Sequence, residues 1–126
     1  MTQNDKELLL KDLCARLPYG VIVHLKYDEN TSVTREMGLG SLHDIMFDSA
    51  EGKPYLRPMS SMTDDELVDY KLLEKQCEIL PTFAYISVSK CVIFDWLNKH
   101  HFDYRGLIPK GLAIEVTEEN NPYCDI

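Results

Sequence analysis

Apolar residues recur at helical spacing near the N-terminus, and this pattern predicts a helix over residues 4–16. Asn4 stands where a capping side chain is expected, and the acidic residues of the first turn suit the positive end of a helix dipole. Pro18 and Gly20 end the helix. The side chains expected to pack inward are Leu9, Leu10, Leu13, Cys14 and Leu17.

The next part of the chain is predicted to form strands, because it is rich in β-branched residues and broken by turn residues. Short strands are expected at residues 21–27, 33–37, 42–47 and 55–57, with turns at residues 28–32 and 48–54. The last of these strands is expected at a sheet edge, since Pro58 stops it. A small, strongly bent sheet of SH3-like type is our hypothesis for residues 20–58.

Thr63-Asp64-Asp65-Glu66 matches the capping box that begins many helices. The apolar residues behind it share one helical face, and they are Leu67, Tyr70, Leu73, Cys77 and Leu80. Pro81 is predicted to end this helix. Residues 83–87 fit either a strand or the start of the next helix, which is predicted to run to about His101.

The C-terminal part is predicted to hold a turn at residues 102–106, a helical turn at 107–110 and a short strand at 112–116. Residues 117–126 are expected to be a flexible acidic tail. One helix, then short strands, then two main helices indicates an α+β fold with a short antiparallel sheet. We expect residues 1–126 to form a single domain, since this length is usual for one.

Charge and composition narrow the function classes. The chain is 44% apolar and carries a net charge of −8, which suits a globular protein and disfavours non-specific binding to nucleic acid or to an anionic membrane. No apolar run approaches the roughly 20 residues of a spanning helix. The N-terminus is too polar for a signal peptide, so we expect a cytoplasmic protein. Residues 64–126 hold six basic and twelve acidic groups, which is either solvated helix surface or an acidic face for a basic partner.

The four cysteines lack the close spacing of a structural zinc site or a redox dithiol. Cys14, Cys77 and Cys91 are expected to be buried thiols, and Cys124 to be exposed. We predict no metal and no cofactor. Gly38-Leu39-Gly40-Ser41 resembles a phosphate-binding loop only weakly, because it lacks both a third glycine and a Gly-Lys-Ser/Thr ending.

Two segments carry candidate binding residues. The first is the run His100, His101, Phe102, Asp103, Tyr104 and Arg105, which could bind an anion or supply an acid–base pair. The alternative is structural, with the histidines at a helix C-terminus and Asp103 and Arg105 tying down a turn, and we favour it. The second segment, residues 53–59, holds Tyr55 and Arg57 between two prolines. These two side chains are either interface anchors or parts of a rigid connector, and we favour the connector.

Residues 10–21, 53–63 and 95–113, about a third of the chain, resemble a family of small hypothetical proteins. The second and third of these runs begin Lys53-Pro54-Tyr55-Leu56-Arg57-Pro58 and Asp95-Trp96-Leu97-Asn98-Lys99-His100-His101. Such proteins recur in gut anaerobic bacteria, their phages and their mobile elements. The resemblance implies an accessory protein of a phage or mobile element and no catalytic residues. The family's strand-rich stretch is represented here by the short region 28–52, which implies a trimmed sheet.

Three hypotheses follow. The leading one is a non-enzymatic protein that binds a protein partner, as an acidic inhibitor or modulator of a host or defence protein; homo-oligomerisation stays open. The second is a binder of a small anionic ligand such as a nucleotide, through Arg57, His100, His101 and Arg105. The third is an enzyme built on residues 100–105, which requires those side chains to converge in a concave pocket.

Overall fold

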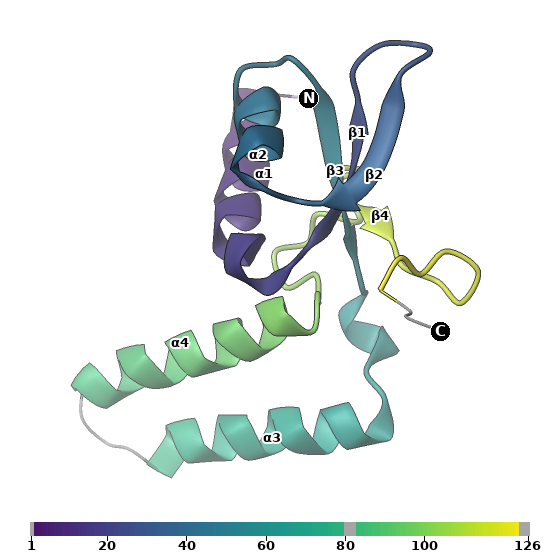
Figure 1. The fold of residues 1–126 in the computed structure, drawn as a ribbon. Coiled ribbons are helices and arrows are strands. Elements are labelled where there is room, and N and C mark those ends of the chain that lie inside the picture. The colour runs from purple at the N-terminus through teal and green to yellow at the C-terminus, as the bar shows by residue number, and fades with distance from the viewer. Residues whose placement is uncertain (1, 80–82, 124–126) are drawn as a thin grey trace.

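A computed structural model describes residues 2–79 and 83–123, and it has the α+β fold that the sequence predicts (Figure 1). Its main elements are α1 (Gln3–Arg16), β1 (Ile22–Lys26), β2 (Ser32–Glu36), α2 (Leu39–Met46), β3 (Glu51–Leu56), α3 (Asp64–Ile79), α4 (Phe83–Lys99) and β4 (Ile114–Glu115). Helices α1 and α2 lie on one side of the sheet, whereas α3 and α4 form a hairpin that projects from the body.

The sheet has the strand order β2-β1-β3-β4. Strand β1 pairs antiparallel with β2 and with β3, and β3 pairs parallel with the short β4. Val23 and Leu25 of β1 are fully buried, so the centre of the sheet forms one wall of the core. Leu9 and Leu13 from α1, together with Ile45 from α2, complete that core. Burial of these apolar side chains is the main stabilising term for the domain.

The predicted strand at residues 42–47 is wrong, because this segment belongs to helix α2. Leu42 and Ile45 are both buried, and their spacing of three residues puts them on one helical face. A run this short fits helix and strand equally well in the sequence. The helix also interrupts the succession of strands that an SH3-like sheet would need, and the parallel β3–β4 pair makes the sheet mixed.

The predicted edge position of residues 55–57 is also wrong, because β3 lies between β1 and β4. Pro54 is tolerated inside the sheet for a geometric reason. The N–H of Val116, just after β4, donates to the carbonyl of Leu56 at 2.8 Å, so the backbone of Leu56 faces β4. Every second residue of a strand faces the same neighbour, so the nitrogen of Pro54 faces β4 as well. Strand β4 pairs only with Tyr55 and Leu56, so no ladder partner lies opposite the missing N–H.

The helix boundaries follow side-chain capping. Thr2, and not Asn4, caps α1: its hydroxyl accepts from the N–H of Asp5 at 3.1 Å, and the Asp5 carboxylate accepts from the N–H of Thr2 at 3.2 Å. The capping box of Thr63 and Glu66 is confirmed by both of its hydrogen bonds. Residues 83–87 are helical, and α4 ends at Lys99, two residues before the predicted end. Pro81 lies outside the described residues.

The burial predicted for the cysteines is wrong at Cys14 and Cys91, which are both exposed. On α1 the buried positions are taken by Asp12, Leu13 and Arg16 instead, and this turns Cys14 outward. The side chain of Cys77 and the whole of Cys124 lie outside the part that the structure describes. Within the segment predicted to be a flexible tail, the hydroxyl of Tyr123 is hydrogen-bonded to both Ile22 of β1 and Tyr55 of β3.

Candidate functional site

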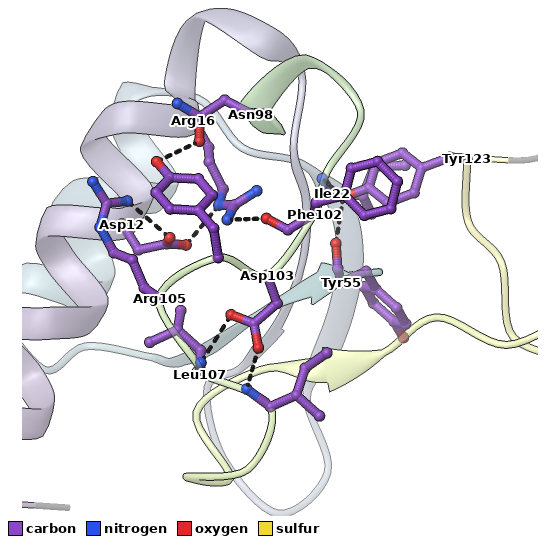
Figure 2. A network of polar contacts seen from close by, with 12 residues as sticks. Asp12, Arg16, Ile22, Tyr55, Asn98, Phe102, Asp103, Arg105, Leu107 and Tyr123 are labelled. Atoms are coloured by element: carbon purple, nitrogen blue, oxygen red, sulfur yellow. Dashed lines mark hydrogen bonds and ion pairs between the residues drawn. The ribbon is translucent and has the colours of Figure 1, made fainter. Parts of the chain in front are cut away.

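The buried side chain of Arg16 joins α1 to the segment that follows α4 (Figure 2). The Nε of Arg16 donates to Asp12 at 2.7 Å, and its Nη2 donates to the carbonyl of Phe102 at 2.6 Å. Arg105 donates to the second carboxylate oxygen of Asp12 at 3.0 Å. Both guanidinium groups also lie near the ring of Tyr104, at 5.2 Å for Arg16 and 4.7 Å for Arg105. This arrangement uses Tyr104 and Arg105 to fix the fold.

Asp103 is buried and organises the loop after α4. Its carboxylate accepts from the N–H groups of Leu107 at 2.8 Å and Ile108 at 2.9 Å, as Figure 2 shows. Its own N–H donates to the carbonyl of Arg57 at 2.8 Å. A carboxylate that accepts two backbone hydrogen bonds is stabilised where it stands, so Asp103 closes the turn instead of facing a ligand.

Arg57 and His100 meet at Glu66, the acidic residue of the capping box of α3. Arg57 donates to the two oxygens of that carboxylate at 2.7 and 2.6 Å, a bidentate pair. The hydrogen bonds from Arg57 lower the pKa of Glu66 to about 2. His100 Nδ1 lies 3.6 Å from the same carboxylate, and burial lowers the pKa of His100. The pair links the connector after β3 to the start of α3, as the rigid-connector interpretation requires.

His101 packs against the C-terminal segment. Its ring stacks on that of Tyr123 with 3.7 Å between centroids, and burial lowers the pKa of His101 to about 4. The Tyr123 hydroxyl accepts from the N–H of Ile22 at 2.9 Å and donates to the carbonyl of Tyr55 at 2.7 Å. Ile22 and Tyr55 are the next pair in the β1–β3 register, so the hydroxyl bridges the ladder where the strands separate. Tyr55 contributes its backbone here.

The predicted residues therefore do not gather at one point. Arg57 and His100 share Glu66, Arg105 pairs with Asp12, and His101 stacks on Tyr123. An enzyme or an anion site built on these residues would need their side chains to converge, and in this geometry they do not. Sequence reasoning missed Asp12 and Arg16, although both lie on the same face of the first helix as Leu9 and Leu13. Opposite charges four residues apart on an apolar face were the available signal.

The outer surface of the α3–α4 hairpin carries exposed apolar side chains. Helix α4 contacts α1 on one side and α3 on the other, so α3 is the outermost element of the hairpin in Figure 1. Val68 and Leu72 are 58% and 52% exposed, and their spacing of four residues places them on one helical face. Leu72 borders a hollow of about 260 Å³ that Leu73 and Trp96 also line.

Acidic and polar residues surround these apolar side chains, together with the exposed Lys71 and Lys75. Helix α3 holds six acidic and two basic residues, a balance of −4. Its outward stripe, which we call the α3 stripe, consists of Asp65, Val68, Asp69, Leu72 and Gln76, all of them exposed. The stripe therefore combines two apolar anchors with two carboxylates at helical spacing.

Among the side chains that the structure describes, which exclude those of residues 77–90, no group of three or more histidine, cysteine and acidic residues is placed to hold a metal ion. No helix within residues 2–79 and 83–123 has the length and apolar character needed to cross a membrane. No family model matches the chain, and neither the curated proteins nor the solved structures include a detectable match to it.

Proposed function

We propose that this protein binds a partner protein through the α3 stripe, and that it does so without catalysing a reaction. The single observation that carries the proposal is the exposure of Val68 and Leu72 on the outermost helix. Exposed apolar side chains at positions i and i+4 are the usual anchors of a helix that lies in an apolar groove.

The charge of the stripe specifies the partner. Asp65 and Asp69 flank the two anchors, and α3 as a whole has a balance of −4. Complementarity calls for an apolar groove bordered by lysine or arginine, because like charges across an interface are costly. Basic grooves of this kind occur on proteins that bind nucleic acid, where carboxylates take the place of phosphates. An acidic inhibitor or modulator of such a protein is the role that we favour.

The source of the partner follows from the sequence resemblance to accessory proteins of phages and mobile elements. We infer a host or defence protein of an anaerobic gut bacterium. This step rests on residues 10–21, 53–63 and 95–113, and the choice of α3 as the docking element does not depend on it.

The test compares what three forms of the protein capture from a lysate of such a bacterium, with quantitative mass spectrometry. The forms are the wild type, a Val68→Ser/Leu72→Ser variant, and a matched control with Val92→Ser on α4, where Val92 is 46% exposed. Circular dichroism checks that all three fold. The proposal expects a protein with a basic surface that the wild type and the control retain and the double variant loses at least about tenfold.

Charge supplies the second arm of the same experiment. Asp65→Asn/Asp69→Asn should weaken capture of that protein, and added salt should weaken it further, because an exposed electrostatic contribution is screened. Identical capture by the wild type and the Val68→Ser/Leu72→Ser variant would overturn the proposal. A partner whose retention does not change with salt would overturn its basic-groove part.

A further inference from the structure

Strand β2 forms an open edge of the sheet (Figure 1). It stands first in the order β2-β1-β3-β4, so no strand of the described part of the chain lies on its outer side. All of its residues, Ser32–Glu36, are exposed. Edge strands are commonly protected by proline, by a bulge or by shortness, as at the two-residue β4 on the other edge. Strand β2 has no proline, and its register with β1 is unbroken over its full length.

One set of backbone groups of β2 points away from the sheet. The N–H of Met37, just after β2, donates to the carbonyl of Val21 at 2.8 Å, so the backbone of Met37 faces β1. Every second residue of a strand faces the same neighbour, so the odd-numbered residues of β2 face β1 as well. The N–H and C=O groups of the even-numbered residues point outward, and no hydrogen bond among the described residues engages them. These residues are Ser32, Thr34 and Glu36.

We propose that β2 pairs antiparallel with β2 of a second copy of this chain, about a two-fold axis at Thr34, so that the two sheets join into one. In this register Thr34 lies opposite Thr34 of the partner subunit, and Ser32 lies opposite Glu36 of the partner subunit. All three are outward-facing residues, so each gives and receives one hydrogen bond, as in the hydrogen-bonded pairs of an antiparallel ladder. The two threonine side chains also meet, which is a favourable cross-strand pair.

The residues of β2 favour this register over its neighbours. An axis at Arg35 would place two arginines directly opposite each other, which is destabilising. An axis at Val33 would leave Glu36 opposite Asn30, which lies outside the strand. With the axis at Thr34 the strand pairs over its whole length, and Arg35 lies opposite Val33 of the partner subunit. The two Arg35 side chains are then diagonal neighbours, and because both are exposed they can extend away from each other.

Charge complementarity supports the same arrangement. The burial pattern of β1 places Lys26 on the face of the sheet away from the core, next to Ser32. Glu36 of the partner subunit lies on the other side of Ser32, about 10 Å from Lys26 between Cα atoms, and the two long side chains can meet across the small serine. Within one chain Lys26 and Glu36 stand at opposite ends of the β1–β2 register. This ion pair therefore forms only between two copies.

Sedimentation velocity of the full-length chain tests the pairing. The proposal expects a reversible monomer–dimer equilibrium with a Kd below about 200 µM. Thr34→Pro removes an outward N–H but no hydrogen bond to β1, so it should weaken the dimer at least about tenfold while the circular dichroism spectrum is kept. Thr34→Val is the matched control, since it keeps that N–H, and it should dimerise as the wild type does. A wild type that stays monomeric up to about 1 mM, or a Thr34→Pro variant that dimerises equally well, would overturn the proposal.

Charge reversal gives a readout that does not depend on proline. Lys26→Glu and Glu36→Lys should each weaken the dimer about threefold, because each places like charges across the interface. The double variant exchanges the two charges and should recover the affinity of the wild type. A double variant weaker than either single variant would overturn the pairing of these two side chains between copies.

Disulfide formation locates the axis. In a background with the four native cysteines replaced by serine, Thr34→Cys places two thiols opposite each other, with Cα atoms about 5.5 Å apart and within reach of a disulfide. Arg35→Cys is the matched control, because its two copies are diagonal and more than about 7 Å apart. Mild oxidation should link the Thr34→Cys variant into a covalent dimer and leave the Arg35→Cys variant monomeric. Faster linking of Arg35→Cys than of Thr34→Cys would overturn the axis at Thr34.

Discussion

Asp12 and Arg16, one turn apart on α1, form an ion pair in which both side chains are fully buried, with 2.7 Å between Oδ2 and Nε. Arg105 lies on the other oxygen of Asp12, so a single carboxylate pairs with two guanidinium groups. The Nη1 of Arg16 is buried without a hydrogen-bond partner in the described residues. The network therefore holds α1 against the loop after α4 through the hydrogen bonds of Arg16 and Asp12.

Replacement of Asp12 by Asn should lower the free energy of unfolding by about 3–5 kcal/mol, because it leaves a buried guanidinium without its counter-charge. Urea denaturation followed by far-UV circular dichroism measures this loss. The matched control is Asp48→Asn, since Asp48 pairs with Lys6 but its side chain is 78% exposed. That change should cost no more than about 1 kcal/mol. Equal costs at the two positions would contradict our account of the network.

Tyr123→Phe should lower the free energy of unfolding by about 1–3 kcal/mol, because it leaves the N–H of Ile22 and the carbonyl of Tyr55 without their partner. Amide hydrogen exchange at Ile22 should also accelerate. Tyr55→Phe removes a hydroxyl for which the described residues supply no hydrogen bond, and it should change stability by about 0.5 kcal/mol or less. A Tyr123→Phe variant as stable as the wild type, with unchanged exchange at Ile22, would refute the bridge.

Stability should fall as the pH decreases from about 6.5 to about 4, because burial holds the pKa of His101 at about 4 in the folded state, against 6.5 ordinarily. In this window the unfolded chain binds the proton and the folded chain does not, so stability rises with pH. The effect of His101 should be roughly 1–2 kcal/mol, once solvent screening at this partly exposed ring is allowed for. The contribution of Glu66, whose pKa is lowered to about 2, is lost only below pH 4.5.

His101→Asn tests this pH dependence, since asparagine tolerates the positive φ of 65° at this position and does not titrate. The variant also loses the stacking on Tyr123, so the comparison is between slopes of stability against pH and not between absolute values. A smaller slope should remain, because burial lowers the pKa of His100 as well. An unchanged slope between pH 5 and pH 6.5 would show that the pKa of His101 is the same in the folded and the unfolded chain.

Local sequence patterns correctly predicted helix α1 and the start of helix α3. The spacing of Leu9 and Leu13 located α1, and the Thr63–Glu66 capping box located the start of α3, because both signals lie within a few residues of the chain. Helix α2 was missed because its eight residues hold too few apolar positions to separate a helical from a strand period.

The sequence indicates which charged residues are important but not which residues they contact. Arg57 and Arg105 were both expected to be important, yet their carboxylate partners Glu66 and Asp12 lie 9 and 93 residues away in the sequence. Such pairs arise only when the sheet and the helices are assembled. The sequence determines which charged side chains are present, and the fold determines which oppositely charged side chain each one contacts.

Gly52→Ala should destabilise the protein by about 1–3 kcal/mol, because an added Cβ would overlap the Ile45 side chain in the core, 2.3 Å from its Cδ1. Thermal unfolding measures the cost. Gly40→Ala is the matched control: its Cβ would meet no atom within 4 Å, and alanine favours the helix, so stability should hold or rise by up to about 1 kcal/mol. Ile45→Val combined with Gly52→Ala should recover part of the loss, since it deletes the Cδ1 methyl that overlaps most. If Gly52→Ala is as stable as the wild type, α2 does not pack against β3 through Ile45.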